Sequence, residues 1–197
     1  MRLSIGDLEL VRADLAAYRR RAEEEEHGFT FGYAQALEAA VSAYHRHNQR
    51  LDLATQHLHR LAFEHEFKNQ RKLADAEHQL AVYADAFSTT GNECIGRLDQ
   101  FVAEMAPGLE ISGRINRYDL TPDGYAVWLF IHKPRQWQKD LRMPLLQWVY
   151  SDILLAPSSE VAVGVYDFPS GAYASLVYSD QQIEAARIEA VRLLRSL

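Results

Sequence analysis

The amino-acid sequence changes character near residue 90, and this change limits the folds that the chain can adopt. All six prolines come after that point, whereas the segment before it is rich in Ala, Leu, Glu, Arg and Gln. A proline-free stretch favours helices, because proline removes a hydrogen bond from a helix interior and clashes with the preceding turn. We therefore expect a helical first half and a mixed second half.

Apolar residues recur at helical spacing in four segments of the first half. We expect helices over residues 4–21, 33–47, 51–67 and 69–87. An acidic run, Glu23 to Glu26, and the pair His27 and Gly28 separate the first of these segments from the second. We expect the acidic run to be a solvated helix end or loop, because adjacent like charges repel one another.

Apolar alternation and turn residues predict a sheet in the second half. The expected strands are residues 98–105, 109–119, 125–132, 161–168 and 172–178, and the expected helices are residues 144–155 and 179–194. Runs of strands with helices packed on them indicate an α/β fold of the mixed α+β kind. We expect a helical region, residues 1–90, to cover a mixed-sheet core, residues 91–197, in one compact unit. A separate N-terminal domain is the alternative.

Composition excludes several classes of protein. Hydrophobic residues make up 48% of the chain and charged residues 24%, a balance that excludes a disordered or collagen-like chain. Cys94 is the only cysteine, so neither an internal disulfide nor a four-cysteine zinc site can form. The net charge of −6 excludes a general polycation but leaves room for a local basic groove. Without a signal-peptide pattern or a bilayer-length apolar run, we expect a cytoplasmic protein.

Residues 113–134, GRINRYDLTPDGYAVWLFIHKP, resemble the central hairpin of the RecB-type branch of the PD-(D/E)xK nuclease superfamily. Members of that branch show a Gly-Arg-Ile-Asp-Arg strand, a short turn, and a strand ending in Asp-Tyr-Lys-Thr. Residues 141–154 resemble the helix that follows, with Gln147 and Tyr150. The order of elements expected over residues 69–168 matches the αβββαβ order of this superfamily. The resemblance implies a restriction-endonuclease-like core and metal-dependent cleavage of nucleic acid.

The chemistry of such nucleases needs two acids that hold a divalent cation and a lysine that positions the attacking water. This sequence departs from the pattern at nearly every position. Asn116 stands where the first acid is expected. The second acid falls at Leu129 or Ile131, and the lysine at Ile131 or Lys133, depending on the register of the strand.

The upstream segment FTFGYAQALEAAVSAYH resembles the family's N-terminal helix, but Gln35 or Ala36 stands where that helix carries a metal-binding His. The resemblance therefore implies a nuclease scaffold without catalytic residues, without a metal and without another cofactor. An active site that binds Mg²⁺ or Mn²⁺ through displaced ligands is the alternative. Asp119, Asp123 and Glu110 are the acids near the hairpin that could form it.

Basic residues surround the expected active site and are the predicted nucleic-acid contacts. They are Arg114, Arg117, Lys133, Arg135, Lys139 and Arg142. A groove that lost its acidic residues but kept its basic residues could bind the phosphates of a nucleic acid without cleaving its backbone. Solvated charges at strand ends and in a loop are the plainer interpretation of the same residues.

Six of the eight histidines lie between residues 45 and 78, but no two are three or four positions apart, the spacing that puts two zinc ligands on one helix face. We expect them to form a solvated polar surface.

Three functions are compatible with the sequence. The first is a catalytically inactive nuclease-like scaffold that acts as a binding or assembly subunit in nucleic-acid-related work, such as repair or defence. The second is an active metal-dependent DNA nuclease with displaced ligands. The third is a helical protein-interaction module that does not bind nucleic acid. We expect a protein partner, consider nucleic acid as a further partner, and expect no membrane association.

Overall fold

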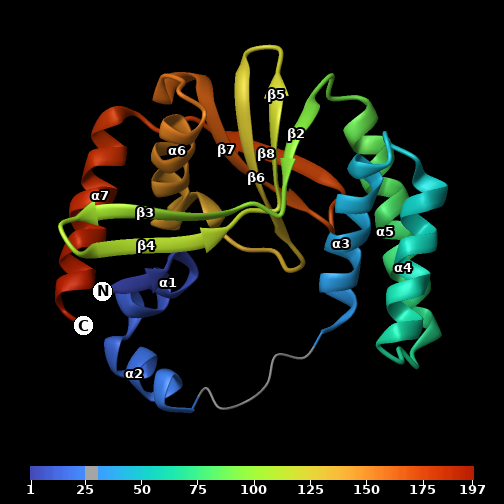
Figure 1. Ribbon diagram of the computed structural model, residues 1–197, viewed down its shortest axis with the longest axis horizontal. Coiled ribbons are helices and arrows are strands. Elements are labelled where there is room, and N and C mark those ends of the chain that lie inside the picture. Colours follow the sequence, from blue (N-terminus) through green and yellow to red (C-terminus); the bar gives the residue numbers. More distant parts are fainter. Residues whose placement is uncertain (25–30) are drawn as a thin grey trace.

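A computed structural model describes residues 1–24 and 31–197 and shows an α+β fold built on a central five-stranded mixed sheet (Figure 1). The strands lie in the order β2 (Glu93–Arg97), β5 (Arg117–Thr121), β6 (Gly124–Ile131), β7 (Val161–Asp167) and β8 (Ala172–Leu176). Within this sheet, β6 and β7 are the one parallel pair among the described residues, because helix α6 (Arg142–Ile153) carries the chain back between these two strands. The predicted α+β class with a central mixed sheet is confirmed.

A second, three-stranded sheet interrupts the central one in the sequence. Its strands lie in the order β1 (Arg2–Ser4), β4 (Leu109–Arg114) and β3 (Gln100–Ala106). The chain leaves the central sheet after β2, forms the β3–β4 hairpin, and returns at Asn116, whose backbone N–H donates to the Trp128 carbonyl at 3.2 Å. Without this excursion the central elements follow the αβββαβ order.

Two of the predicted strands are therefore wrong in their bounds. The strand predicted over residues 98–105 is β3, which begins at Gln100, because Leu98 lies in a turn with a φ of 49°. β2, before that turn, was not predicted. Residues 109–119 are two strands in different sheets, separated at Ile115 and Asn116. At the second break the period-two alternation continues, because Ile111 and Ile115 are buried in one core and Arg117 and Asp119 are buried against the other face of the central sheet.

The predicted first helix, residues 4–21, is also divided. α1 (Ile5–Ala13) ends at Asp14, whose φ of −158° is extended, and α2 (Leu15–Glu24) follows. Ser4 caps α1, since its Oγ accepts a hydrogen bond from the Asp7 N–H at 3.1 Å. The acidic run Glu23 to Glu26 and the break at His27 and Gly28 extend into residues 25–30, outside the described residues.

The remaining predicted elements match the structure with small shifts at their ends. The helices are α3 (Tyr33–Arg46), α4 (Leu51–Glu64), α5 (Gln70–Ser88), α6 and α7 (Asp180–Arg195). Ser179 caps α7 and its backbone N–H donates to Gln182 Oε1 at 2.9 Å, a capping box that fixes where this helix starts. No helix in residues 1–24 or 31–197 has the length and apolarity needed to cross a membrane.

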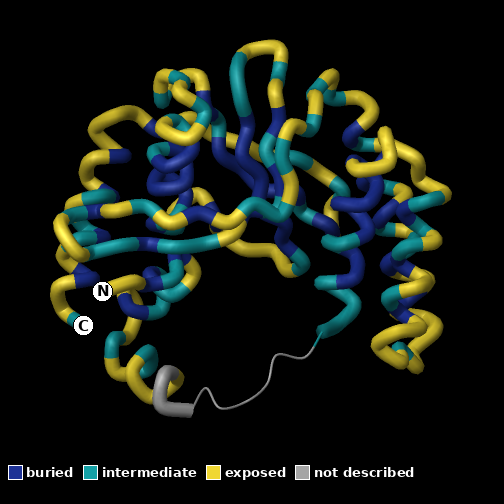
Figure 2. Tube along the Cα trace, viewed as in Figure 1, coloured by how far each residue is buried: buried dark blue, intermediate teal, exposed yellow. Residues whose placement is uncertain are grey.

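Two hydrophobic cores lie on opposite faces of the central sheet (Figure 2). In the first, α1, α6 and α7 pack with the small sheet against side chains such as Val127, Leu129 and Val163. In the second, α3, α4 and α5 pack against Phe130 and Tyr166. Residues 1–90 are thus divided between the two faces, and α3 to α5 are the helices that cover the face relevant to the site below.

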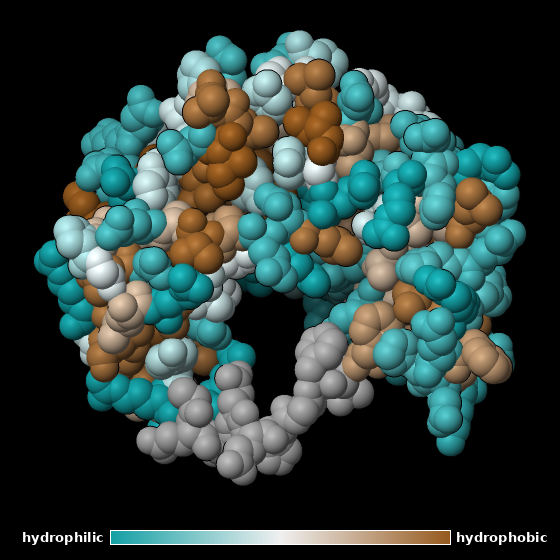
Figure 3. Space-filling view, viewed as in Figure 1, coloured by the Kyte–Doolittle hydropathy of each residue, from teal (hydrophilic) through white to brown (hydrophobic). Residues whose placement is uncertain are grey.

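The outer surface over α4 and α5 differs from the surface over α6 and the β5–β6 hairpin. Hydrophilic side chains cover most of the helical layer of α4 and α5, whereas apolar side chains gather over α6 and the β5–β6 hairpin (Figure 3). Leu120 on β5 and Ile153 on α6 are 42% and 46% exposed.

A buried ion pair on β5 connects the helical layer to the sheet. Arg117 and Asp119 are 1% and 0% exposed, and Arg117 Nε lies 2.8 Å from Asp119 Oδ1. The second carboxylate oxygen of Asp119 accepts from Trp128 Nε1 at 2.8 Å and from Asn92 Nδ2 at 3.3 Å. Burial raises the pKa of Asp119, and the positive charge of Arg117 opposes that shift.

Aromatic residues from three elements surround the Arg117 guanidinium. It donates to the hydroxyl of Tyr83 on α5 and, at 3.1 Å, to that of Tyr173 on β8. It lies 4.6 Å from the ring centroid of Phe87. His45 on α3 completes the group, because its Nε2 lies 2.6 Å from the Tyr83 hydroxyl.

Asp119→Asn removes the charge that neutralises Arg117 and leaves a buried cation without a counter-charge. We expect the free energy of unfolding in guanidinium chloride to fall by about 3 to 5 kcal/mol. Asp123→Asn, an exposed change in the turn after β5, is the matched control and should alter stability by less than about 0.5 kcal/mol. Equal stability of the two variants would show that the buried pair does not hold the layers together.

Burial, and then the positive charge of Arg117, lower the pKa of His45 to about 2. In the unfolded chain this pKa is about 6.5, so between these values the unfolded state binds a proton that the folded state does not. Unfolding therefore becomes easier as the pH falls below about 6.5. When the pH is lowered from 7.5 to 5.5, we expect the free energy of unfolding in urea to fall by about 1 kcal/mol more for the wild type than for His45→Gln. His47→Gln, at an exposed position, should behave as the wild type does.

Candidate functional site

Asn116 lies where the chain returns to the central sheet, and its amide joins three elements. Its Oδ1 accepts from the backbone N–H of Phe130 on β6 at 2.8 Å. Its Nδ2 donates to Oε2 of Glu38 on α3 at 2.9 Å. Both ends of the amide are therefore satisfied, and the side chain is fixed between the sheet and the helical layer.

Glu38 is the centre of the site. Its side chain is 15% exposed, and its carboxylate also contacts Arg114 Nη2 at 3.3 Å and His132 Nε2 at 3.1 Å. The His132 ring stacks on Phe168, with ring centroids 4.8 Å apart and planes 14° apart. One carboxylate thus has an amide, a guanidinium and an imidazole as partners.

Two surface hollows reach this cluster. A cavity of about 460 Å³ is lined by Phe31, Gln35, Glu38, Ala39, Leu98 and Arg114. A smaller one of about 180 Å³ includes Tyr33, Leu37, Lys72 and His132 in its lining. Glu38 and His132 are therefore within reach of solvent from two sides of α3.

The donor set does not fit a magnesium or manganese ion. Such ions are held by several oxygen ligands, with at least one and commonly two carboxylates. Among the residues that the structure describes, Glu38 is the one carboxylate in this cluster, and its oxygens are taken by Arg114, Asn116 and His132. Two facing carboxylates repel each other unless a cation or a shared proton lies between them, whereas an amide N–H bonds directly to a carboxylate. In residues 1–24 and 31–197, no three His, Cys, Asp or Glu side chains are grouped as metal ligands.

Three positions expected from the nuclease pattern lie outside the Glu38 cluster. Leu129 and Ile131 are each 7% exposed and belong to the core with α6, on the opposite face of β6 from Trp128 and Phe130. Lys133 is exposed after the end of β6. Of the expected degenerate positions, only Asn116 is in the cluster.

Glu38 and His132 were missed by sequence reasoning. A signal for Glu38 is present, because it is the only acidic residue in the alanine-rich segment Tyr33–Arg46. His132 directly follows the apolar strand β6, next to the predicted Lys133. Neither signal shows that the two side chains meet, since they are 94 residues apart.

The helix that resembles the family's Gln- and Tyr-bearing helix places these side chains elsewhere. Gln147 is fully buried and forms hydrogen bonds with both backbone groups of Tyr178, at 2.7 and 2.9 Å. The Tyr150 hydroxyl donates to Asp99 Oδ2 at 2.9 Å. Both residues hold neighbouring segments in place and are not part of the Glu38 cluster.

The predicted basic surface is smaller than the sequence suggests. The predicted nucleic-acid contact at Arg117 is wrong, because this side chain is buried in the ion pair with Asp119 and cannot contact a phosphate. Arg114 pairs with Glu38, and Arg135 and Arg142 share Asp140. Lys133 and Lys139 are exposed in the segment between β6 and α6. The solvent-exposed part of the predicted surface is therefore this segment, together with Arg114 beside Glu38, whose side chain is 51% exposed.

The acids considered for a displaced metal site lie apart. Asp119 is buried with Arg117, Asp123 is in the exposed turn between β5 and β6, and Glu110 pairs with Arg2 on the small sheet. The histidines are likewise separated: His59 pairs with Glu77, and His65 stacks on Phe31. Burial raises the pKa of the Cys94 thiol to about 12, so this thiol is protonated at neutral pH.

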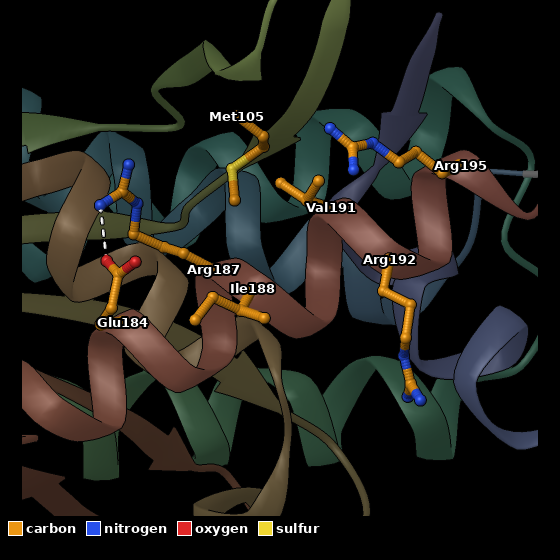
Figure 4. A pocket seen from close by; sticks show the side chains of 7 residues that line it. All are labelled: Met105, Glu184, Arg187, Ile188, Val191, Arg192 and Arg195. Carbon is orange, nitrogen blue, oxygen red and sulfur yellow. Dashed lines mark hydrogen bonds and ion pairs between the residues drawn. The ribbon is translucent and has the colours of Figure 1, made fainter.

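A groove on the outer side of α7 is separate from this site. It measures about 420 Å³ and has Met105, Ile188 and Val191 in its floor, with arginines at its rim (Figure 4). One of these, Arg187, pairs with Glu184 at 2.8 Å and lies 4.6 Å from the ring centroid of Trp148.

Comparisons with known proteins support the fold. No protein-family model and no curated protein match this chain. A solved structure from Eubacterium rectale, named "Putative exonuclease", aligns with 98% of this chain and 81% of its own, at 10% identity and a TM-score of 0.53. A second solved structure, named SSO0001, aligns with 93% of this chain and 87% of its own at 11% identity, with a TM-score of 0.33. The first likeness shows a shared fold and leaves the chemistry to the residues of the site.

Asn116→Asp should create the repulsion that a metal normally relieves. Without divalent cations we expect a fall of about 3 °C in the melting temperature, because two carboxylates then face each other near 3 Å. Mn²⁺ should restore most of this loss in the variant and leave the wild type unchanged.

Asn92→Asp is the matched control, since it also places an acid beside a carboxylate, that of Asp119. It should lose stability without recovering it in Mn²⁺, because Arg117 already neutralises Asp119. Equal stabilisation of wild type and Asn116→Asp by Mn²⁺ would contradict the account of the site.

Proposed function

We propose that this protein is a catalytically inactive nuclease-like scaffold of the RecB type, acting as a binding or assembly subunit in nucleic-acid-related work such as repair or defence. The observation that carries the proposal is the hydrogen bond between Asn116 and Glu38 at 2.9 Å. An acid at position 116 would place a second carboxylate beside Glu38, as metal-dependent nucleases of this type require, whereas the amide bonds to Glu38 directly. The fold is kept, and the charge that metal-assisted cleavage of a phosphodiester requires is missing.

The surroundings of Glu38 support the same proposal. Arg114 and His132 add positive or hydrogen-bonding partners to the remaining carboxylate, so it has little tendency to bind a cation. Leu129 and Ile131 face an apolar core, so neither register of β6 supplies a second acid.

Contact with nucleic acid is the second part of the proposal, and it rests on the segment between β6 and α6. Lys133 and Lys139 are exposed there, and Arg135 lies between them in the sequence with a side chain that is 42% exposed. Lysines on a surface segment bind phosphates without sequence preference and in a salt-dependent way. The single free thiol, Cys94, is compatible with a cytoplasmic location, where disulfides are rare.

One experiment with labelled single- and double-stranded DNA tests both parts. In Mg²⁺ or Mn²⁺, we expect denaturing gels to show DNA of full length, because the site lacks the ligands for a cation. Metal-dependent cleavage that Glu38→Gln abolishes would overturn the proposal.

In native gels at low salt, the same DNA should bind, and Lys133→Ala with Lys139→Ala should weaken the affinity about tenfold. Lys68→Ala with Arg71→Ala removes two exposed cations from outside the hollows described above and is the matched control. Absence of any salt-dependent shift would remove the nucleic-acid part and leave the assembly role.

A further inference from the structure

β8 differs from the other sheet edges in the described residues. Unpaired edge strands pair readily with other chains, and proteins usually protect them with charges, bulges or short length. β2 carries Glu93 and Arg97 and has a register shift, β3 carries Glu104 and a register shift, and β1 has only three residues. β8, with the sequence AYASL, has no charge, no proline and no register shift.

The open edge of β8 is also solvent-exposed. Ala172, Ala174 and Ser175 are exposed, and Leu176 and Val177 are 43% and 52% exposed. Alternate backbone N–H and C=O groups of an edge strand point away from its only neighbour, here β7. β8 thus presents a row of free hydrogen-bonding groups beside apolar side chains.

A hollow of about 500 Å³ lies next to this edge, on the face of the sheet that α3 to α5 cover only in part. Small residues are part of its lining, because Ala126 and Ala162 lie opposite each other on β6 and β7, and Ser175 follows on β8. Its lining includes Tyr173, Ser175 and Val177, alternate positions from β8 and the residue that follows it. A strand added to β8 would point every second side chain toward this hollow.

The lining favours a positively charged side chain. It contains the carboxylates of Asp123 and Glu160 and the aromatic rings of Tyr125, Trp128 and Tyr173, and no Lys, Arg or His. Aromatic faces and carboxylates together attract ammonium and guanidinium groups. The net charge of −6 makes a second copy of the chain a poor occupant, since two copies repel each other.

We propose that β8 binds an extended segment of a protein partner as an added strand, with a lysine or arginine of that segment in the hollow. This recognition mode takes affinity from main-chain hydrogen bonds and specificity from pockets for alternate side chains. The inference rests on the assembly role proposed above and names the surface and the chemistry of the partner. Its test uses no nucleic acid, so either proposal can fail alone.

The probe is a capped nine-residue peptide of alternating threonine and valine with lysine at its centre, labelled with a fluorophore. We expect saturable binding in fluorescence anisotropy, with an affinity at least about tenfold higher than that of the same peptide with a central glutamate. Hydrogen exchange should slow at alternate backbone amides of residues 172–177 when the lysine peptide is bound, and β2 and β3 should not change.

Asp123→Asn with Glu160→Gln should reduce the preference for lysine to less than about threefold while leaving the exchange protection of β8. Asp75→Asn with Glu184→Gln removes the same net charge from exposed positions outside the hollow and should retain the full preference. The proposal is overturned by binding without protection of β8, by equal affinity for the glutamate peptide, or by no binding. A concentration-dependent dimer that protects β8 in the absence of peptide would assign the edge to a second copy and also overturn it.

Discussion

The buried ion pair between Arg117 and Asp119 is the interaction on which the rest of the structure depends. Both charges are removed from water, so each needs its partners in place to offset the loss of hydration. Those partners come from α5, β6, β8 and the segment before β2, and His45 brings α3 to the same cluster. The pair therefore fixes the distance between the helical layer and the sheet. α3 carries Glu38, so the same packing sets the geometry of the candidate site.

At that site, the amide of Asn116 sets the electrostatics. It connects β5 to β6 through Phe130 and bonds directly to Glu38, which an acid at the same position would repel. The fold shared with the exonuclease-named structure from Eubacterium rectale is maintained by the two cores, whereas the chemistry of a site depends on a few charged side chains. The shared fold and the proposed absence of catalysis are therefore compatible.

Sequence patterns predicted the helices after residue 30, the β6 strand, α6 and α7 with small errors, because each has a continuous periodicity or a cap. They missed β2, a five-residue edge strand, and they failed at Ile115, where the chain changes sheets while its alternation continues. They also failed for Arg117, because a single arginine between polar residues gives no sign that a carboxylate and a set of aromatic rings will enclose it. Glu38 was missed for a related reason, since its partners are distant in the sequence and a pattern within one helix does not report them.

The proposed function depends on the direct hydrogen bond between α3 and the central hairpin, which leaves Glu38 without a vacant oxygen for a metal ion. Calorimetric titration of the wild-type protein with Mn²⁺ measures this most directly. We expect only the heat of dilution, with no saturable binding, because Asn116, Arg114 and His132 already contact the oxygens of the Glu38 carboxylate. A single saturable site with one ion per chain, abolished by Glu38→Gln, would contradict it.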